Sequence, residues 1–149
     1  MIKLALATIL FCTLGHAQII GGGVSYNQSG SPSIAGTGIY AKELTSGLWS
    51  FSLLDVIPTS TSPITLTTQL STGIGQRLFT VKSWQIFTPT TTGITWTGSN
   101  TGWTWTSGLM GVREIKGRLV MPNVRWIKST VNNNSSYQCV AGVMIGWKL

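Results

Sequence analysis

Alternation of apolar and polar residues is the feature of this sequence that most limits what it can fold into. The segment Tyr137–Leu149 shows it most clearly, because every second residue is apolar and the residues between are mainly small or polar. Successive side chains of a β-strand point to opposite faces, so this period of two predicts a strand with one apolar face. No stretch beyond residue 17 holds apolar residues at helical spacing. The sequence therefore predicts an all-β protein.

The same alternation predicts eight strands whose connections alternate in length. Short links are expected at residues 45–47, 80–82 and 114–117, and longer polar loops at 29–32, 58–63, 97–101 and 129–136. This order is typical of an up-and-down meander with the longer loops at one end. Irregular pairing is expected at Pro89 and Pro122, since proline cannot donate a ladder hydrogen bond. The predicted strands are Gln18–Gln28, Ser33–Leu44, Leu48–Ile57, Ile64–Phe79, Ser83–Trp96, Gly102–Arg113, Arg118–Lys128 and Tyr137–Leu149.

The first residues have the composition of an export signal. Lys3 precedes an apolar run from Leu4 to Leu14, and small residues follow at Gly15 and Ala17. An apolar run of about 11 residues is much shorter than the ~20 of a transmembrane helix, which disfavours the alternative of an N-terminal anchor. The sequence predicts a removable signal at 1–17 and one barrel domain at 18–149.

Few side chains beyond residue 17 suit catalysis or metal binding. His16 and Cys12 lie in the predicted signal, Cys139 is the one cysteine beyond it, and the carboxylates are Glu43, Asp55 and Glu114. Hydrolase triads and zinc clusters need more than this set, so no enzymatic activity, metal or cofactor is expected. Basic residues are dispersed without a nucleic-acid motif, so no nucleic-acid partner is expected. Only 9% of residues are charged, against about 25% in an average soluble domain.

Aromatic residues gather near both ends of the predicted strands, where the two interfaces of a bilayer would select them. The predicted outer belt, beside the longer loops, is Tyr26, Trp96, Trp103, Trp105, Trp126 and Tyr137. The predicted inner belt, beside the short links, is Tyr40, Trp49, Trp84 and Trp147.

Between the two belts, one face of the strands is expected to meet lipid and the other the barrel interior. For segment 33–44, the alternation does not decide which face of the strand points outward. Thr88, Thr90 and Ser107 interrupt the apolar face. The expected outward residues are Leu53, Leu66, Leu70, Ile86, Leu109, Val124, Val143 and Ile145, and the expected inward ones include Thr65, Thr67, Gln69, Thr104, Thr106 and Asn123.

An open sheet edge in hydrocarbon would leave unpaired N–H and C=O groups, each costing several kcal/mol, so the strands must close. The predicted fold is an antiparallel up-and-down transmembrane β-barrel of eight strands. A barrel of eight strands has an interior just wide enough to be filled by side chains, here polar and small ones. Asp55 and Arg125 are candidates for an ion pair inside it.

The end of the sequence resembles the signal that the barrel-assembly machinery reads in outer-membrane β-barrel proteins. The signal residues are Val143, Ile145, Trp147 and Leu149, although Leu149 stands where that family usually has Phe or Trp. With the export signal and eight segments, the chain resembles small barrels of the outer-membrane protein A/X type. The resemblance implies a Gram-negative outer membrane, longer loops outside the cell, and the assembly machinery as a partner during insertion.

Several functions stay open at this point. The first is a non-enzymatic integral membrane barrel with a structural or loop-displaying role, in which Arg125 or Lys128 contacts the anionic sugars of lipopolysaccharide. The second is a secreted, soluble β-barrel or sandwich that binds a carbohydrate or small ligand through Trp96, Trp103 and Trp105. A narrow pore is the third.

Overall fold

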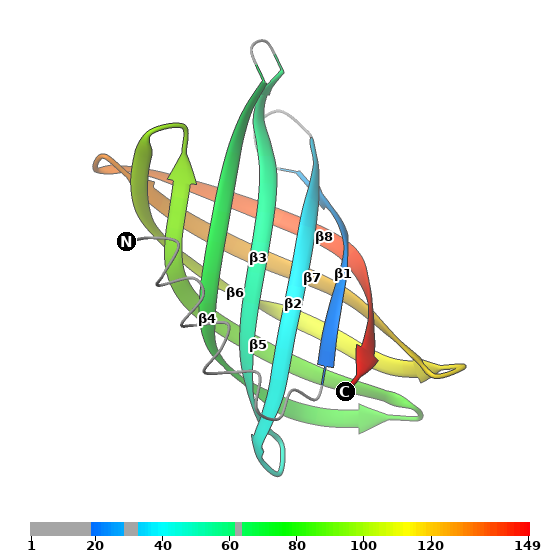
Figure 1. The fold of residues 1–149 in the computed structure, drawn as a ribbon. Coiled ribbons are helices and arrows are strands. Elements are labelled where there is room, and N and C mark those ends of the chain that lie inside the picture. Colours follow the sequence, from blue (N-terminus) through cyan, green and yellow to red (C-terminus); the bar gives the residue numbers. More distant parts are fainter. Residues whose placement is uncertain (1–18, 29–32, 62–63) are drawn as a thin grey trace.

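Eight antiparallel strands pair in chain order and close into a ring, because the last strand also pairs with the first (Figure 1). The computed structural model describes residues 19–28, 33–61 and 64–149. The closing pair runs from Ile19 opposite Lys148 to Asn27 opposite Val140. The predicted up-and-down barrel is confirmed. Its strands are β1 (Ile19–Asn27), β2 (Ser33–Thr45), β3 (Leu48–Thr61), β4 (Ile64–Val81), β5 (Trp84–Thr97), β6 (Asn100–Ile115), β7 (Arg118–Val131) and β8 (Asn134–Lys148).

The predicted export signal at 1–17 lies outside the described residues, and so does the predicted loop at 29–32. Within the part of the chain that the structure describes, no helix is long and apolar enough to cross a membrane.

The hairpins are tighter than the sequence predicts. Strands β5 and β6 are separated by two residues, as are β7 and β8, so the predicted polar loops at 97–101 and 129–136 are wrong. Asn132 and Asn133 both have positive φ, at 50° and 64°, which suits a two-residue turn of type I′. The neighbouring polar residues extend the strands instead, and the Thr130 and Ser135 hydroxyls lie 2.9 Å apart across the hairpin.

Most of the predicted loop at 58–63 is also strand, since β3 runs to Thr61 and β4 begins at Ile64. The pairing of β3 with β4 shifts register between Pro58 and Ser60. Further shifts lie at Glu43/Thr45 and Arg77/Phe79.

Pro89 and Pro122 interrupt the pairing without shifting its register. Pairs of β5 with β6 stop at Phe87 opposite Met110 and resume at Thr90 opposite Ser107. Pairs of β6 with β7 are likewise interrupted beside Pro122. Each proline thus perturbs the sheet on one side only, because each still pairs with a residue of its other neighbouring strand, Gly75 and Val143 respectively.

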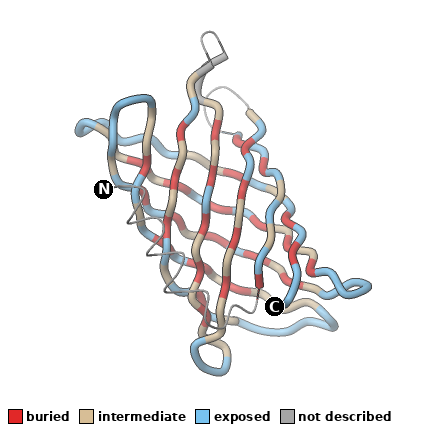
Figure 2. Tube along the Cα trace, in the orientation of Figure 1, coloured by how far each residue is buried: buried red, intermediate tan, exposed pale blue. Residues whose placement is uncertain are grey.

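Burial alternates along every strand, so the inward residues form a core inside the ring (Figure 2). The strongly curved wall brings backbones together at glycines on the lumen side. A Cβ atom at Gly73 would lie 2.1 Å from the Thr90 carbonyl oxygen, and one at Gly93 would lie 1.9 Å from the Leu70 carbonyl oxygen. Both separations are far inside van der Waals contact. Only glycine permits this bend, which a barrel of eight strands requires.

A methyl group at Gly93 should therefore destabilise the barrel. We expect Gly93→Ala to lower the free energy of unfolding by more than about 3 kcal/mol, above the usual cost of overpacking, because the obstacle is backbone. Gly36→Ala is the control, since a Cβ at Gly36 meets no atom within 4 Å. Urea unfolding followed by tryptophan fluorescence would measure both, and equal effects would contradict this account of the curvature.

Candidate functional site: the lumen and the outer wall

Large apolar side chains fill the half of the lumen nearer the pair of Ile19 and Lys148. Phe51 and Phe87 are each 1% exposed, and Met121 and Met144 are fully buried. The Phe87 ring makes edge-on contacts with Phe51 and with Trp49, with centroids 6.1 and 5.5 Å apart. The expectation of a polar, small-residue interior is therefore correct for only part of the lumen.

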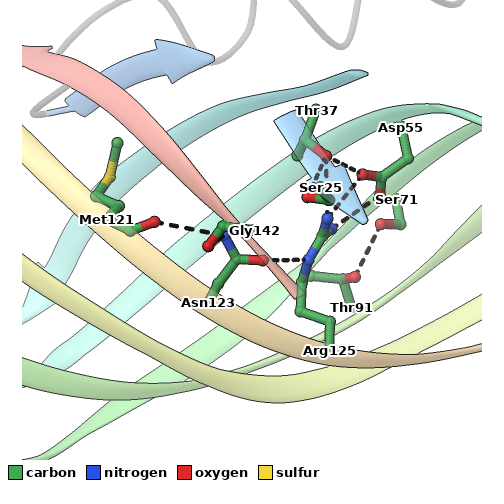
Figure 3. A network of polar contacts seen from close by, with 9 residues as sticks. All are labelled: Ser25, Thr37, Asp55, Ser71, Thr91, Met121, Asn123, Arg125 and Gly142. Carbon is green, nitrogen blue, oxygen red and sulfur yellow. Dashed lines mark hydrogen bonds and ion pairs between the residues drawn. The ribbon is translucent and has the colours of Figure 1, made fainter. Parts of the chain in front are cut away.

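The polar part is organised by an ion pair that crosses the barrel. Arg125 is on β7 and Asp55 on β3, four strands apart in the ring of eight. The guanidinium donates two hydrogen bonds of 2.8 Å, from Nη1 to Oδ2 and from Nη2 to Oδ1 of Asp55. Both residues are at most 2% exposed. The structure thus brings the two candidate lumen residues together as a buried, bidentate pair (Figure 3).

Three further side chains hold this pair in place. Arg125 Nε donates to Asn123 Oδ1 at 3.0 Å, and its Nη2 donates to Thr37 Oγ1 at 3.1 Å. The Thr37 hydroxyl donates in turn to Asp55 Oδ1 at 2.6 Å and lies 3.3 Å from the Ser25 hydroxyl (Figure 3). A buried ion pair requires such additional hydrogen bonds, because they satisfy the donors and acceptors that the pair itself leaves free. The network joins β1, β2, β3 and β7.

A second contact spans the lumen beside this network. Gln69 Nε2 on β4 donates to Ser129 Oγ on β7 at 2.7 Å. Side chains from opposite walls therefore meet in the interior at both positions.

Two expectations for β3 are wrong for the same reason. Trp49 is 8% exposed and Leu53 is 2% exposed, so both face the lumen and not the outside. They share their face with Asp55, at spacings of six and two residues. Placing a carboxylate in the interior, where Arg125 neutralises it, turns both apolar side chains inward with it. Trp49 is consequently a core residue and not part of an aromatic belt.

The outer wall carries apolar side chains in the middle of the strands. Leu109, Val124, Val143 and Ile145 are 39–47% exposed, and Leu66, Leu70 and Ile86 share their outward face. Buried residues on the opposite face include Thr67, Gln69, Thr104, Thr106 and Asn123, as the alternation predicts.

Hydroxyl groups on this wall are internally hydrogen-bonded. The Thr90 and Ser107 hydroxyls lie 3.3 Å apart, the Ser52 hydroxyl donates to Thr72 at 3.3 Å, and the Thr88 hydroxyl donates to the Gln76 carbonyl at 3.4 Å. Residues that interrupt the apolar pattern therefore present few unpaired polar groups to their surroundings. Satisfied hydroxyls are tolerated in hydrocarbon far better than free ones.

The remaining nine belt residues all lie on outward faces of their strands. Tyr26, Trp103, Trp105, Trp126, Tyr137 and Trp147 are exposed, and Tyr40, Trp84 and Trp96 are half-buried. Lys128 lies among the outer-belt rings, with its Nζ 5.5 Å from the ring centroids of both Trp103 and Tyr137. The final residues Val143, Ile145, Trp147 and Leu149 are also exposed.

The lumen ends in a shallow cavity of about 360 Å³ at the end where Ile19 pairs with Lys148. Its lining includes the buried Trp49 and Phe87 and charged residues from four strands: Glu43, Arg77, Glu114 and Lys148. Among the described residues, no group of three or more His, Cys, Asp or Glu side chains could hold a metal ion.

Sequence reasoning missed Thr37 and the aromatic core of β3. The face of β2 could not be chosen because both of its faces mix apolar and polar residues, yet Thr37 pairs directly with Asp55 across β2 and β3. Once Asp55 is placed inside, that register also places Thr37 inside.

Comparison with known proteins shows a similarity of fold. No family model matches the sequence and no curated protein matches it. A solved structure described as "De novo design of transmembrane beta-barrels" superposes with a TM-score of 0.54 at 11% identity, covering 90% of this chain and 96% of that one. The fold is that of a transmembrane β-barrel.

Breaking the ion pair should be costly, because it leaves an uncompensated charge in the lumen. We expect Asp55→Asn and Arg125→Met each to lower the free energy of unfolding by about 3–5 kcal/mol, and the double variant to cost less than the sum. Urea unfolding in detergent micelles would measure the coupling. The exposed pair of Glu114 and Lys148 is the control, and its removal should cost at most about 1 kcal/mol. If each single variant lost no more unfolding free energy than the control, a structural role for the pair of Asp55 and Arg125 would be contradicted.

Proposed function

We propose that this protein is a non-enzymatic, integral β-barrel of a bacterial outer membrane, exported by the signal at residues 1–17. The observation that supports it best is the outer wall, which exposes apolar side chains and on which the hydroxyls of Thr88, Thr90 and Ser107 are hydrogen-bonded within the wall. In water such a wall would favour aggregation, whereas in a bilayer it would face acyl chains.

A structural role fits the barrel better than a pore or a display scaffold. The apolar core and the ion pair between Asp55 and Arg125 occupy the lumen, which leaves little room for a water column. The β5–β6 and β7–β8 turns have only two residues each, so they offer little surface for a partner.

The second candidate is carbohydrate binding through Trp96, Trp103 and Trp105. All three side chains lie on outward faces of β5 and β6. An outward position on the convex barrel wall suits an interfacial aromatic belt better than a sugar site, which is usually concave. We therefore favour the membrane barrel.

Within this proposal, the exterior partners are lipids. Lys128, between Trp103 and Tyr137, is placed to contact an anionic group of lipopolysaccharide. The run of outward residues from Val143 to Leu149 would be read by the barrel-assembly machinery during insertion. Arg125 is withdrawn from any such contact, because it is buried with Asp55.

Extraction of cell envelopes tests the location. Carbonate or urea should leave the protein in the membrane fraction, and the folded protein should need detergent to stay in solution. Its mobility on a gel should change on heating, because a closed barrel resists detergent until it is boiled. Release into the soluble fraction would exclude the membrane barrel and favour the secreted alternative.

A charged substitution in the middle of the outer wall distinguishes the membrane barrel from the soluble alternative. Leu109→Arg should lower the free energy of unfolding in lipid vesicles by about 2–4 kcal/mol if Leu109 lies near the bilayer midplane. Ser135→Arg, beside the β7–β8 turn, should change it little. A soluble barrel would tolerate both substitutions, because both positions would face water.

A further inference from the structure

At the end of the barrel where Ile19 pairs with Lys148, the carboxylate side chains lie on the lumen side of the wall. Glu43 and Glu114 line the cavity at the mouth of the lumen, together with Arg77 and Lys148. The third carboxylate of the chain, Asp55, lies deeper and pairs with Arg125. All three carboxylates therefore belong to the lumen side, where cations match them.

The outward face at the same end carries basic side chains and none of the three Asp and Glu side chains of the sequence. Arg113 and Arg118 lie on the outer face because their neighbours Val112 and Leu119 point into the lumen. Lys82 and Lys116 are exposed in the β4–β5 and β6–β7 turns. We call these four residues the basic patch.

The two hairpins that carry the basic patch are adjacent. Strands β5 and β6 pair directly, with Gln85 opposite Val112, and Figure 1 shows both hairpins extending from the same side of the barrel. Arg118 pairs with Ile115 on the β6–β7 hairpin. The four basic residues of the patch thus lie on two neighbouring hairpins at one end of the barrel.

Apolar and aromatic side chains border the patch on the outer wall. The Arg113 guanidinium lies 5.7 Å from the centroid of the Trp84 ring, and Phe79, Val81 and Ile115 are 43–53% exposed. Cations beside an aromatic ring and an apolar wall match the chemistry of a lipid, whose phosphate lies directly above its acyl chains.

We infer that the basic patch binds the phosphate groups of anionic phospholipids in the leaflet at this end of the barrel. This inference rests on the proposed function, since it requires the wall to face lipid. Zwitterionic lipids carry their own cation, so four basic side chains that form no ion pair with a described Asp or Glu favour a lipid with net negative charge. Arginine also suits phosphate through paired N–H donors.

Lipid association measured by electron spin resonance tests the inference. The folded protein is reconstituted in phosphatidylcholine vesicles that contain trace spin-labelled phosphatidylglycerol or phosphatidylcholine, and the relative association constant of the two probes is determined. Two matched variants each remove one Lys and one Arg from the same end. Lys82→Gln/Arg118→Gln changes the basic patch, and Arg77→Gln/Lys148→Gln changes the lumen mouth.

The wild-type protein should prefer phosphatidylglycerol at low salt. The patch variant should lower that preference by at least about twofold, and added salt should weaken it in the wild type. The mouth variant should keep the wild-type preference. Equal association of both probes with the wild type, or equal losses in the two variants, would overturn the inference while leaving the membrane barrel intact. A wild-type protein that does not remain in the vesicles would instead overturn the proposed function.

Discussion

The need to pair every backbone N–H and C=O group governs this structure. Pairing of β1 with β8 leaves the sheet without an edge, which is the condition for a β-structure to exist in hydrocarbon. Closure with only eight strands makes the wall strongly curved. The curvature explains why glycines such as Gly73 and Gly93 face the lumen, where neighbouring backbones leave no room for a Cβ atom.

Closure with eight strands also determines how wide the interior is and therefore what can fill it. Eight strands enclose a space that side chains fill, and here the filling is apolar around Phe51 and Phe87 and polar around Arg125. A wall apolar on both sides over part of its height is therefore compatible with a stable barrel. Contacts across the lumen, from β3 to β7 and from β4 to β7, tie opposite sides of the wall together.

Alternation along the chain was enough to predict the fold, the strand number and most inward and outward positions. Trp49 and Leu53 could not be assigned from hydrophobicity alone, because the buried carboxylate of Asp55 on the same face decides their direction. The hairpins at 97–101 and 129–136 were mistaken for loops, since Ser, Thr and Asn are as acceptable in a strand that leaves the hydrocarbon as in a loop. Pairing of Asp55 with Arg125 could be suggested from the residues, but its supports Thr37 and Asn123 depend on strand register.

Both sides of the wall hold apolar residues. Hydrophobicity alone therefore does not determine which side of each strand faces the lumen. The salt link between β3 and β7 removes that ambiguity. Sliding either strand by a single residue would swing a carboxylate or a guanidinium out among acyl chains. A shifted register would therefore cost electrostatic free energy as well as packing, so the pair favours the observed inside and outside of β3 and β7.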